Sequence, residues 1–273
     1  LPKKGTYYVH LLDAQQSGSA AHAYRLHLTP PRADFELRIS PSSITIRPGG
    51  VLPVWIHALR KDGFDGAIDV NVKYGPEGFS LSGGRIPPGK DRVLATLQAP
   101  MKTNPVPVYI SMEGTARVDG RTISRRVVPA EDMMQAFLWR HLVPMQELAV
   151  NVLGSKYRVP PVKRAQSGPV RIPAGGMTRV HFTKPKNVNV NNLRLVLKDP
   201  PEGVALQRVI PSKEGIDLVL RADIALADAG LADNLFFDVI QQSGGQMKDG
   251  KKVPVRNNNL GMLPAIPFEV YRR

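Results

Sequence analysis

The sequence predicts an all-β protein made of two tandem copies of one domain. Short runs of Val, Ile, Leu and Thr alternate with polar residues, and 24 Gly and 25 Pro separate these runs, which is the pattern of many short strands joined by turns. The sequence also repeats itself. The motif at residues 46–50 returns at 172–176, and the Pro-Glu-Gly turn at 76–78 returns at 201–203.

The composition agrees with this organisation. A length of 273 residues is typical of about two domains, and a hydrophobic content of 42% is enough for a core in each. The chain has no cysteine, which excludes disulfides, thiolate metal sites and a cysteine nucleophile but leaves the compartment open. Apolar runs stay short of the roughly 18 residues that cross a bilayer, so we expect no membrane span.

Residues 1–32 are predicted to form a β-hairpin. Apolar and polar residues alternate at 7–13 and again at 23–28, around a polar connection. Because an isolated two-stranded hairpin is marginally stable in water, we interpret it as the C-terminal hairpin of a truncated upstream β domain.

Residues 33–130 are predicted to form the first sandwich. We expect strands near 35–40, 43–47, 51–60, 66–74, 79–82, 91–98, 106–117 and 121–128. Asp119-Gly120 is typical of a tight hairpin turn, because both central residues need a positive φ. This many strands in about one hundred residues favours an immunoglobulin-like sandwich. We expect Trp55 to fill the core position that a disulfide occupies in antibody domains.

Residues 131–144 are predicted to form a helical connector. Acidic residues open this segment, Arg140 and His141 close it, and Pro144 follows. An apolar stripe that includes Met133 and Phe137 would lie on one helix face. We expect this face to pack between the two sandwiches. The alternative is a helix that binds a partner.

Residues 145–273 are predicted to form the second immunoglobulin-like sandwich, with 147–152 in the role that 35–39 play in the first. Its polar stretch at 244–262 has no counterpart in the first copy, and long loops often carry function. Asn257, Asn258 and Asn259 in this stretch are therefore candidate ligand contacts. Tyr7 and Tyr8 are two further candidates, since exposed aromatic rings can stack on a glycan.

The sequence predicts no catalytic residue, cofactor or metal site, and hence a protein that is not an enzyme. Residues 84–90 have the Gly-x4-Gly-Lys spacing of a phosphate loop, but a strand rather than a helix is expected after them. His10 with His27 as a zinc pair, and Asp62 with Asp65 as a calcium turn, are the weaker alternatives to ordinary exposed side chains and an ordinary turn.

The formal net charge is +14. The excess is spread over both halves and includes only doublets of basic residues, unlike the clustered patches of nucleic-acid binders, so no nucleic-acid partner is expected. A solvated basic surface is one interpretation. The other is contact with a polysaccharide or another anionic polymer of the cell envelope.

Two sets of sequence segments resemble known bacterial sequences. Residues 8–13 and 24–28, followed by 31–35, resemble the closing strands of the bacterial pre-peptidase C-terminal domain. Residues 41–44, 47–50, 60–66, 129–137 and 140–144 are similar to segments of long exported proteins of planctomycetes and related bacteria. The resemblance implies a non-catalytic β-sandwich array that is secreted, periplasmic or on the cell surface. Its partners would be other domains of the same polypeptide. A carbohydrate- or polyanion-binding module is the alternative.

Overall fold

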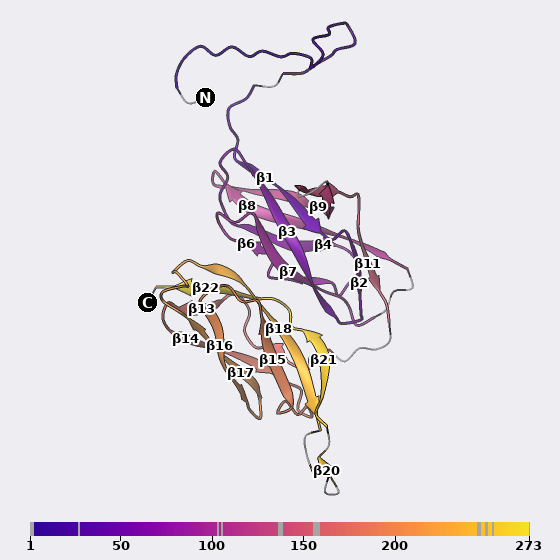
Figure 1. The fold of residues 1–273 in the computed structure, drawn as a ribbon, viewed down its shortest axis with the longest axis vertical. Coiled ribbons are helices and arrows are strands. Elements are labelled where there is room, and N and C mark those ends of the chain that lie inside the picture. The colour runs from indigo at the N-terminus through magenta and orange to yellow at the C-terminus, as the bar shows by residue number, and fades with distance from the viewer. Residues whose placement is uncertain are drawn as a thin grey trace. The chain divides into compact units, whose positions relative to one another are not determined.

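The computed structural model describes residues 3–26, 28–102, 104, 106–135, 139–154, 159–244, 247–248, 251–252 and 254–272. These residues form strands, turns and loops, with no helix among them. The chain divides into two compact units, Leu1–Arg32 and Ala33–Arg273. The second unit contains all the strands (Figure 1).

The first half of the larger unit is one β-sandwich. Its strands are β1 (Asp34–Ser40), β2 (Ser43–Ile46), β3 (Val51–Lys61), β4 (Ile68–Tyr74), β5 (Ser80–Ser82), β6 (Arg85–Ile86), β7 (Arg92–Gln98), β8 (Val108–Val118), β9 (Arg121–Gln135), β10 (Trp139–Pro144) and β11 (Leu148–Val152). One layer has the order β1-β3-β7-β5, and the other has β2-β11-β8 with β4. The long strand β9 pairs with β8 and then with β1, so it connects the two layers into a single 11-stranded sheet.

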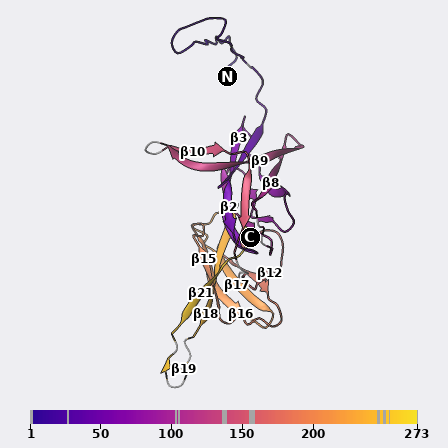
Figure 2. The same cartoon turned by 90° about the vertical axis from the view of Figure 1, so that its right-hand side faces the viewer.

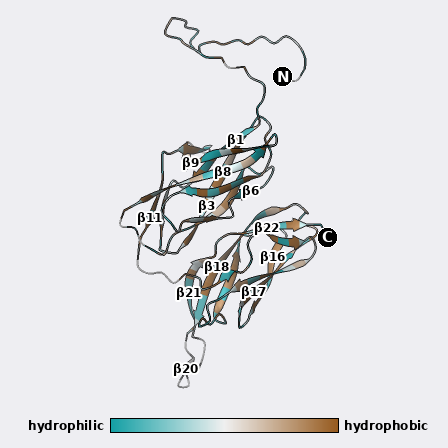
Figure 3. Ribbon diagram, turned by 180° about the vertical axis from the view of Figure 1, so that it is seen from behind, coloured by the Kyte–Doolittle hydropathy of each residue, from teal (hydrophilic) through white to brown (hydrophobic). Residues whose placement is uncertain are grey.

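Side chains from both layers form the first core. Leu37, Ile56 and Leu97 come from one layer, and Met112 and Val150 come from the other, all of them buried. Figure 3 shows the alternation of apolar and polar residues along the strands that produces this core. The expectation that Trp55 lies in the core is wrong. Its neighbours along β3 point inward, so Trp55 faces outward and is 38% exposed.

The second half is a second β-sandwich. Its strands are β12 (Lys163–Arg164), β13 (Val170–Pro173), β14 (Met177–Thr183), β15 (Leu193–Lys198), β16 (Val204–Pro211), β17 (Gly215–Ala222), β18 (Ala232–Ser243), β19 (Met247–Lys248), β20 (Lys251–Lys252), β21 (Arg256–Met262) and β22 (Ile266–Tyr271). One sheet has the order β12-β14-β17-β16. The other has β13-β22-β18-β15, with β21 also paired to β18. A separate core cluster includes Phe182, Leu218, Phe237 and Phe268.

The two sandwiches share one topology. In each, the strand before the repeated glycine turn pairs in parallel with the last strand, β2 with β11 and β13 with β22. In each, that last strand is antiparallel to the long strand beside it, β8 or β18. The sequence repeat therefore corresponds to a repeat of strand order.

The repeated glycines adopt matching backbone conformations. Gly49 and Gly175 have φ values of 68° and 71°, and Gly78 and Gly203 have 94° and 81°. Values in this range favour glycine over residues that carry a Cβ. The predicted turn at Asp119 and Gly120 likewise has positive φ at both residues.

The predicted connecting helix is not formed. β9 continues to Gln135 and β10 returns beside it, in a register that runs from Trp139 opposite Gln135 to Pro144 opposite Ala130. The charges that suggested helix ends instead face each other across the strands: Arg140 donates two hydrogen bonds to Asp132, at 3.0 and 2.8 Å. We refer to β10 and the paired part of β9 as the arm, which Figure 2 shows leaving the sandwich. Phe137 lies outside the described residues.

The expected domain boundary at 145 is also corrected. β11 belongs to the first sandwich, because it pairs with β2 and β8 and its residues Leu148, Val150 and Val152 are buried in the first core. The counterpart of β1 in the second sandwich is β12, which pairs with β14 as β1 pairs with β3. Parallel pairing of β11 with a strand about one hundred residues earlier cannot be recognised from local alternation.

The described residues of the Leu1–Arg32 unit form turns and extended segments without strand pairing, so the predicted hairpin is not seen. Its apolar side chains, such as Tyr8 and Leu12, are exposed, and without burial they supply little free energy to hold two strands together. The expectation of a loop at residues 257–259 is also wrong, because these residues lie in strand β21.

Candidate functional site

The two sandwiches contact each other through buried polar groups. Asn234, at the start of β18 and only 5% exposed, donates hydrogen bonds from Nδ2 to the backbone oxygens of Gly83 and Leu94, both at 2.8 Å. Thr96 of β7 is 1% exposed, and its Oγ1 accepts a hydrogen bond from the backbone N–H of Ala265 at 2.8 Å. We call this contact region the seam. Buried and satisfied hydrogen bonds fix orientation, because an alternative arrangement would leave these groups unpaired.

The alternation of side chains along each strand determines which way Asn234 and Thr96 point. Leu235 and Phe237 of β18 point into the second core, so Asn234 points to the opposite side, toward the first sandwich. Thr96 lies on β7 directly opposite Pro53 of β3. Sequence analysis missed both residues. A polar residue on the outer side of a strand looks solvent-exposed until a second domain covers it.

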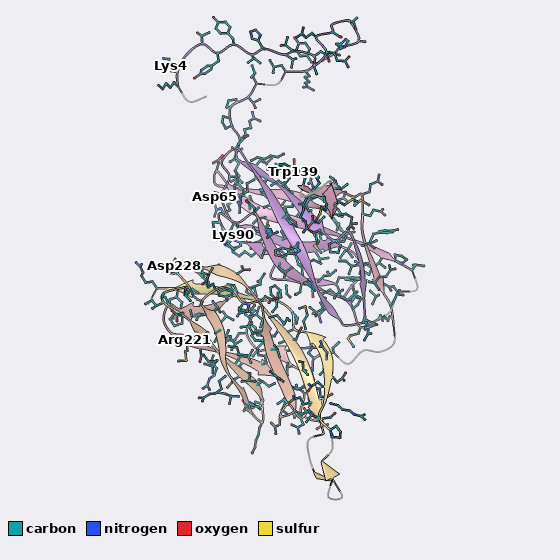
Figure 4. All side chains as sticks on the ribbon, in the orientation of Figure 1. Lys4, Asp65, Lys90, Trp139, Arg221 and Asp228 are labelled. Atoms are coloured by element: carbon teal, nitrogen blue, oxygen red, sulfur yellow. The ribbon has the colours of Figure 1, made fainter. Side chains whose placement is uncertain are left out.

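A cavity of about 790 Å³ lies along one side of the seam. The first sandwich contributes Trp55 and Arg92, and the second contributes Phe236 and Asp238. A second cavity of about 610 Å³ adjoins it, because Lys90, Asp233 and Asn234 line both. We call the two together the seam groove. Figure 4 labels two residues that line the seam groove from opposite sides, Lys90 on the first sandwich and Asp228 on the second.

Carboxylates outnumber cations in the seam groove. Six line it: Asp91, Asp199, Asp228, Asp233, Asp238 and Glu269. The four cations are Arg85, Lys90, Arg92 and Lys198. The lining is therefore locally acidic, although the whole chain has a net charge of +14.

Trp55 is held in place on the outer face of β3. The guanidinium of Arg92 lies over its ring, 4.7 Å from the ring centroid, a cation–π arrangement. The imidazole of His57 lies beside it, with ring centroids 6.3 Å apart. Burial of His57, and then the positive charge of Arg92, lower the pKa of His57, while Asp132 acts in the opposite direction. The Nε2 atom of His57 is buried without a hydrogen-bond partner among the described residues.

A second candidate surface lies at one end of the second sandwich. Lys184, Lys186 and Lys213 surround a concavity of about 660 Å³, between the β14–β15 connection and the turn before β17. Asn187, Asn189 and Asn191 complete its polar lining, which contains no carboxylate residue. We call it the lysine bowl.

The structure does not bring the five sequence-predicted contacts together. Tyr7 and Tyr8 are 43% and 87% exposed in the Leu1–Arg32 unit. Asn257, Asn258 and Asn259 are exposed on β21, opposite Gln242, Gln241 and Ile240. The Nε2 atom of Gln242 donates a hydrogen bond to the Oδ1 atom of Asn257 at 3.1 Å. None of the five lines the seam groove or the lysine bowl.

The other sequence alternatives are placed as follows. A strand, β7, follows residues 84–90, as predicted, where a phosphate loop requires a helix. His27 lies outside the described residues, so a zinc pair with His10 is not described. Over the described residues, no group of three or more His, Asp or Glu side chains is arranged to hold a metal ion. The part of the chain that the structure describes has no helix of the length and apolar character needed to cross a membrane.

Comparison with known proteins gives only distant structural matches. No family model and no curated protein matches the chain. Among solved structures, domains 4–9 of the surface layer protein SbsC match 89% of this chain and 32% of that one, at 10% identity and a TM-score of 0.30. An endo-fucoidan hydrolase of glycoside hydrolase family 107 matches over 84% and 27%, at 9% identity and a TM-score of 0.24. The chain spans about a third or less of the length of each.

The two surfaces differ in the chemistry that they offer. The lysine bowl presents ammonium groups and amides, which suit phosphate, sulfate or carboxylate groups. The seam groove presents an aromatic ring among carboxylates and cations. The carboxylates can accept hydrogen bonds from hydroxyl groups, and the cations can donate hydrogen bonds to them. The seam groove is the larger surface, and buried hydrogen bonds between the sandwiches hold its two walls.

Proposed function

We propose that this chain is a non-catalytic pair of immunoglobulin-like sandwiches, serving as a structural and interaction segment of a larger secreted, periplasmic or cell-surface protein. The observation that carries the proposal is the hydrogen bonding of Asn234 across the seam. A segment that sets the spacing of neighbouring domains has to keep its own two modules in a fixed orientation, and a buried, satisfied polar contact does this.

Two features support the immunoglobulin-like comparison. Each sandwich has antiparallel layers around one core, and in each the strand before the glycine turn pairs in parallel with the last strand. The pre-peptidase C-terminal relationship of residues 1–32 remains part of the proposal. This relationship is supported only by the sequence segments at 8–13, 24–28 and 31–35.

The chain has no cysteine, so two introduced cysteines give unique labelling sites for a test of rigidity. Thr122→Cys and Arg208→Cys place nitroxide labels at exposed positions of the first and the second sandwich. We expect a narrow distribution of label distances by pulsed electron paramagnetic resonance. A broad distribution, like that of two domains on a flexible linker, would contradict the structural role.

A second candidate function is a carbohydrate- or polyanion-binding module at the cell envelope, which the lysine bowl favours. Three lysines without a carboxylate in the lining give a local positive potential. We expect retention on heparin that decreases steeply with salt, and that is reduced when Lys184, Lys186 and Lys213 are changed to Gln.

A matched control removes three charges elsewhere. Lys102, Arg117 and Arg121 are exposed in the first sandwich, and changing them to Gln produces the same net charge as the lysine bowl variant. Equal loss of retention in both variants would show a general charge effect and rule out the lysine bowl as a specific site.

A further inference from the structure

We propose that the seam groove binds an uncharged oligosaccharide, with the indole of Trp55 as its stacking surface. The proposal rests on the carbohydrate-binding candidate above and gives it a site and a ligand class. It concerns a different surface from the lysine bowl, so the two can be tested separately.

The first step is the aromatic surface. Trp55 is 38% exposed, it lines the larger cavity of the groove, and it is one of only two tryptophans in the chain. The C–H faces of a pyranose ring pack on an aromatic ring, which offers apolar area at little cost in side-chain entropy. The guanidinium of Arg92 lies over one face of the indole, 4.7 Å from the ring centroid, and holds it in one orientation, so the part of the ring left exposed is the part on which a sugar would pack. Binding therefore requires little reordering of Trp55.

The second step is the shape of the site. The two cavities, of about 790 and 610 Å³, share Lys90, Asp233 and Asn234 in their linings and continue along the same seam. Two adjoining cavities along one seam offer neighbouring subsites for a linear chain of several sugar units. A compact ligand would occupy only one of the two cavities.

The third step is charge. With six carboxylates and four cations, the lining repels a polyanion and has no excess of positive charge to attract one. The same mixture of Asp, Lys and Arg can hydrogen-bond to neutral hydroxyl groups, which both donate and accept. The seam groove thus selects against acidic polymers.

The test uses the two tryptophans. A Trp139→Phe variant leaves Trp55 as the only tryptophan, so its fluorescence reports on the groove. The probes are cellohexaose, xylohexaose, mannohexaose, laminarihexaose and chitohexaose, titrated at low and high salt. We expect a saturable change in emission with at least one probe, and an affinity that is the same at both salt concentrations, since no counterions are released.

Calorimetry on further variants locates the site. Trp55→Ala should weaken binding by about tenfold or more, because the stacking area is lost, whereas Trp55→Phe should retain part of the affinity. Trp139→Ala is the matched control, because Trp139 is 74% exposed on the arm and does not line the groove. Circular dichroism checks that each variant is folded, and Trp55→Phe serves if Trp55→Ala fails to fold.

Three results would overturn the proposal. One is the absence of saturable binding with all five probes. Another is unchanged affinity in the folded Trp55 variants. The third is binding that heparin competes away or that high salt abolishes. Heparin retention through the lysine bowl could still be present in each case, so failure of this proposal is distinct from failure of the polyanion-binding candidate.

Discussion

The side-chain nitrogen of Asn234 lies 2.8 Å from the backbone oxygen of Gly83, across the seam between the two sandwiches. A Cβ atom added to Gly83 would lie 2.5 Å from that same nitrogen, which is closer than non-bonded atoms approach. Gly83 also has a φ of 74°. Asn234 and Gly83 therefore fit each other only because the glycine has no side chain.

Gly83→Ala should weaken the seam. The added methyl group clashes with Asn234, and overpacking of this kind costs about 1–3 kcal/mol. Gly120→Ala is the matched control, because Gly120 has a nearly equal φ of 77° and has nothing within 4 Å of an added Cβ. The difference in free energy of unfolding between the two variants, measured by chemical denaturation, isolates the contact. Equal destabilisation would mean that Asn234 moves aside without cost.

Asn234→Ala should release the two sandwiches from their fixed orientation. The substitution removes the donor from the carbonyl oxygen of Gly83, which is buried, and from that of Leu94, which is partly buried, and this costs about 1–3 kcal/mol. Asn258→Ala, at an exposed position on β21, is the control. We expect the spin-label distance distribution to broaden in the first variant and to stay narrow in the second. An unchanged distribution in Asn234→Ala would show that other contacts determine the orientation.

The stability of the first sandwich should decrease as the pH falls below about 6.5. His57 has a folded-state pKa below its ordinary value of 6.5, chiefly because it is buried. The unfolded chain therefore takes up a proton first, and the free energy of unfolding falls with pH until folded His57 is protonated as well. His57→Leu should remove this part of the pH dependence in denaturant titrations at several pH values.

Acidic groups act in a different pH window. The pKa values of Asp34, Glu36 and Asp132 are lowered from ordinary values of 3.8 to 4.5, each chiefly by a hydrogen bond from Arg or Lys. The stability that they contribute is present above those ordinary values and is lost only as the pH falls further.

If the wild type and His57→Leu showed parallel pH profiles near pH 6, the assignment to His57 would be wrong.

The two tryptophans should differ in their access to solvent. Trp139 on the arm is 74% exposed, whereas Trp55 is 38% exposed and lies beneath Arg92. We expect acrylamide to quench the Trp55→Phe variant, which retains Trp139, more strongly than the Trp139→Phe variant. Equal quenching would show that the arm is folded against the protein or held in an interface.

Local sequence predicts the strands well where alternation and turn residues agree. The turn at Asp119 and Gly120 and the repeated turns at Gly49 and Gly175 are determined by backbone conformation, which neighbouring residues control. Strand parity also shows that Trp55, between inward-facing Val54 and Ile56, has to face outward. The expectation that an aromatic residue fills the core overrode that pattern.

Other features depend on contacts between distant parts of the chain. The charges of Asp132 and Arg140 fit a helix or a cross-strand pair equally well, and pairing of β9 with β10 decides between them. The assignment of β11 to the first sandwich requires its parallel pairing with β2. Asn234 and the seam groove exist only because a second domain covers the first, so no local pattern could predict them.

The parallel pairing of β2 with β11, and of β13 with β22, also determines how the chain would respond to mechanical tension. Residues 43–46 lie beside 149–152 in the same direction, and 170–173 lie beside 268–271. A force that reaches β2 or β13 from the N-terminal side and pulls against the last strand of the same sandwich acts along these strands, so it loads all hydrogen bonds of the pair in shear. Each sandwich is therefore expected to resist stretching along the chain more strongly than peeling from one edge.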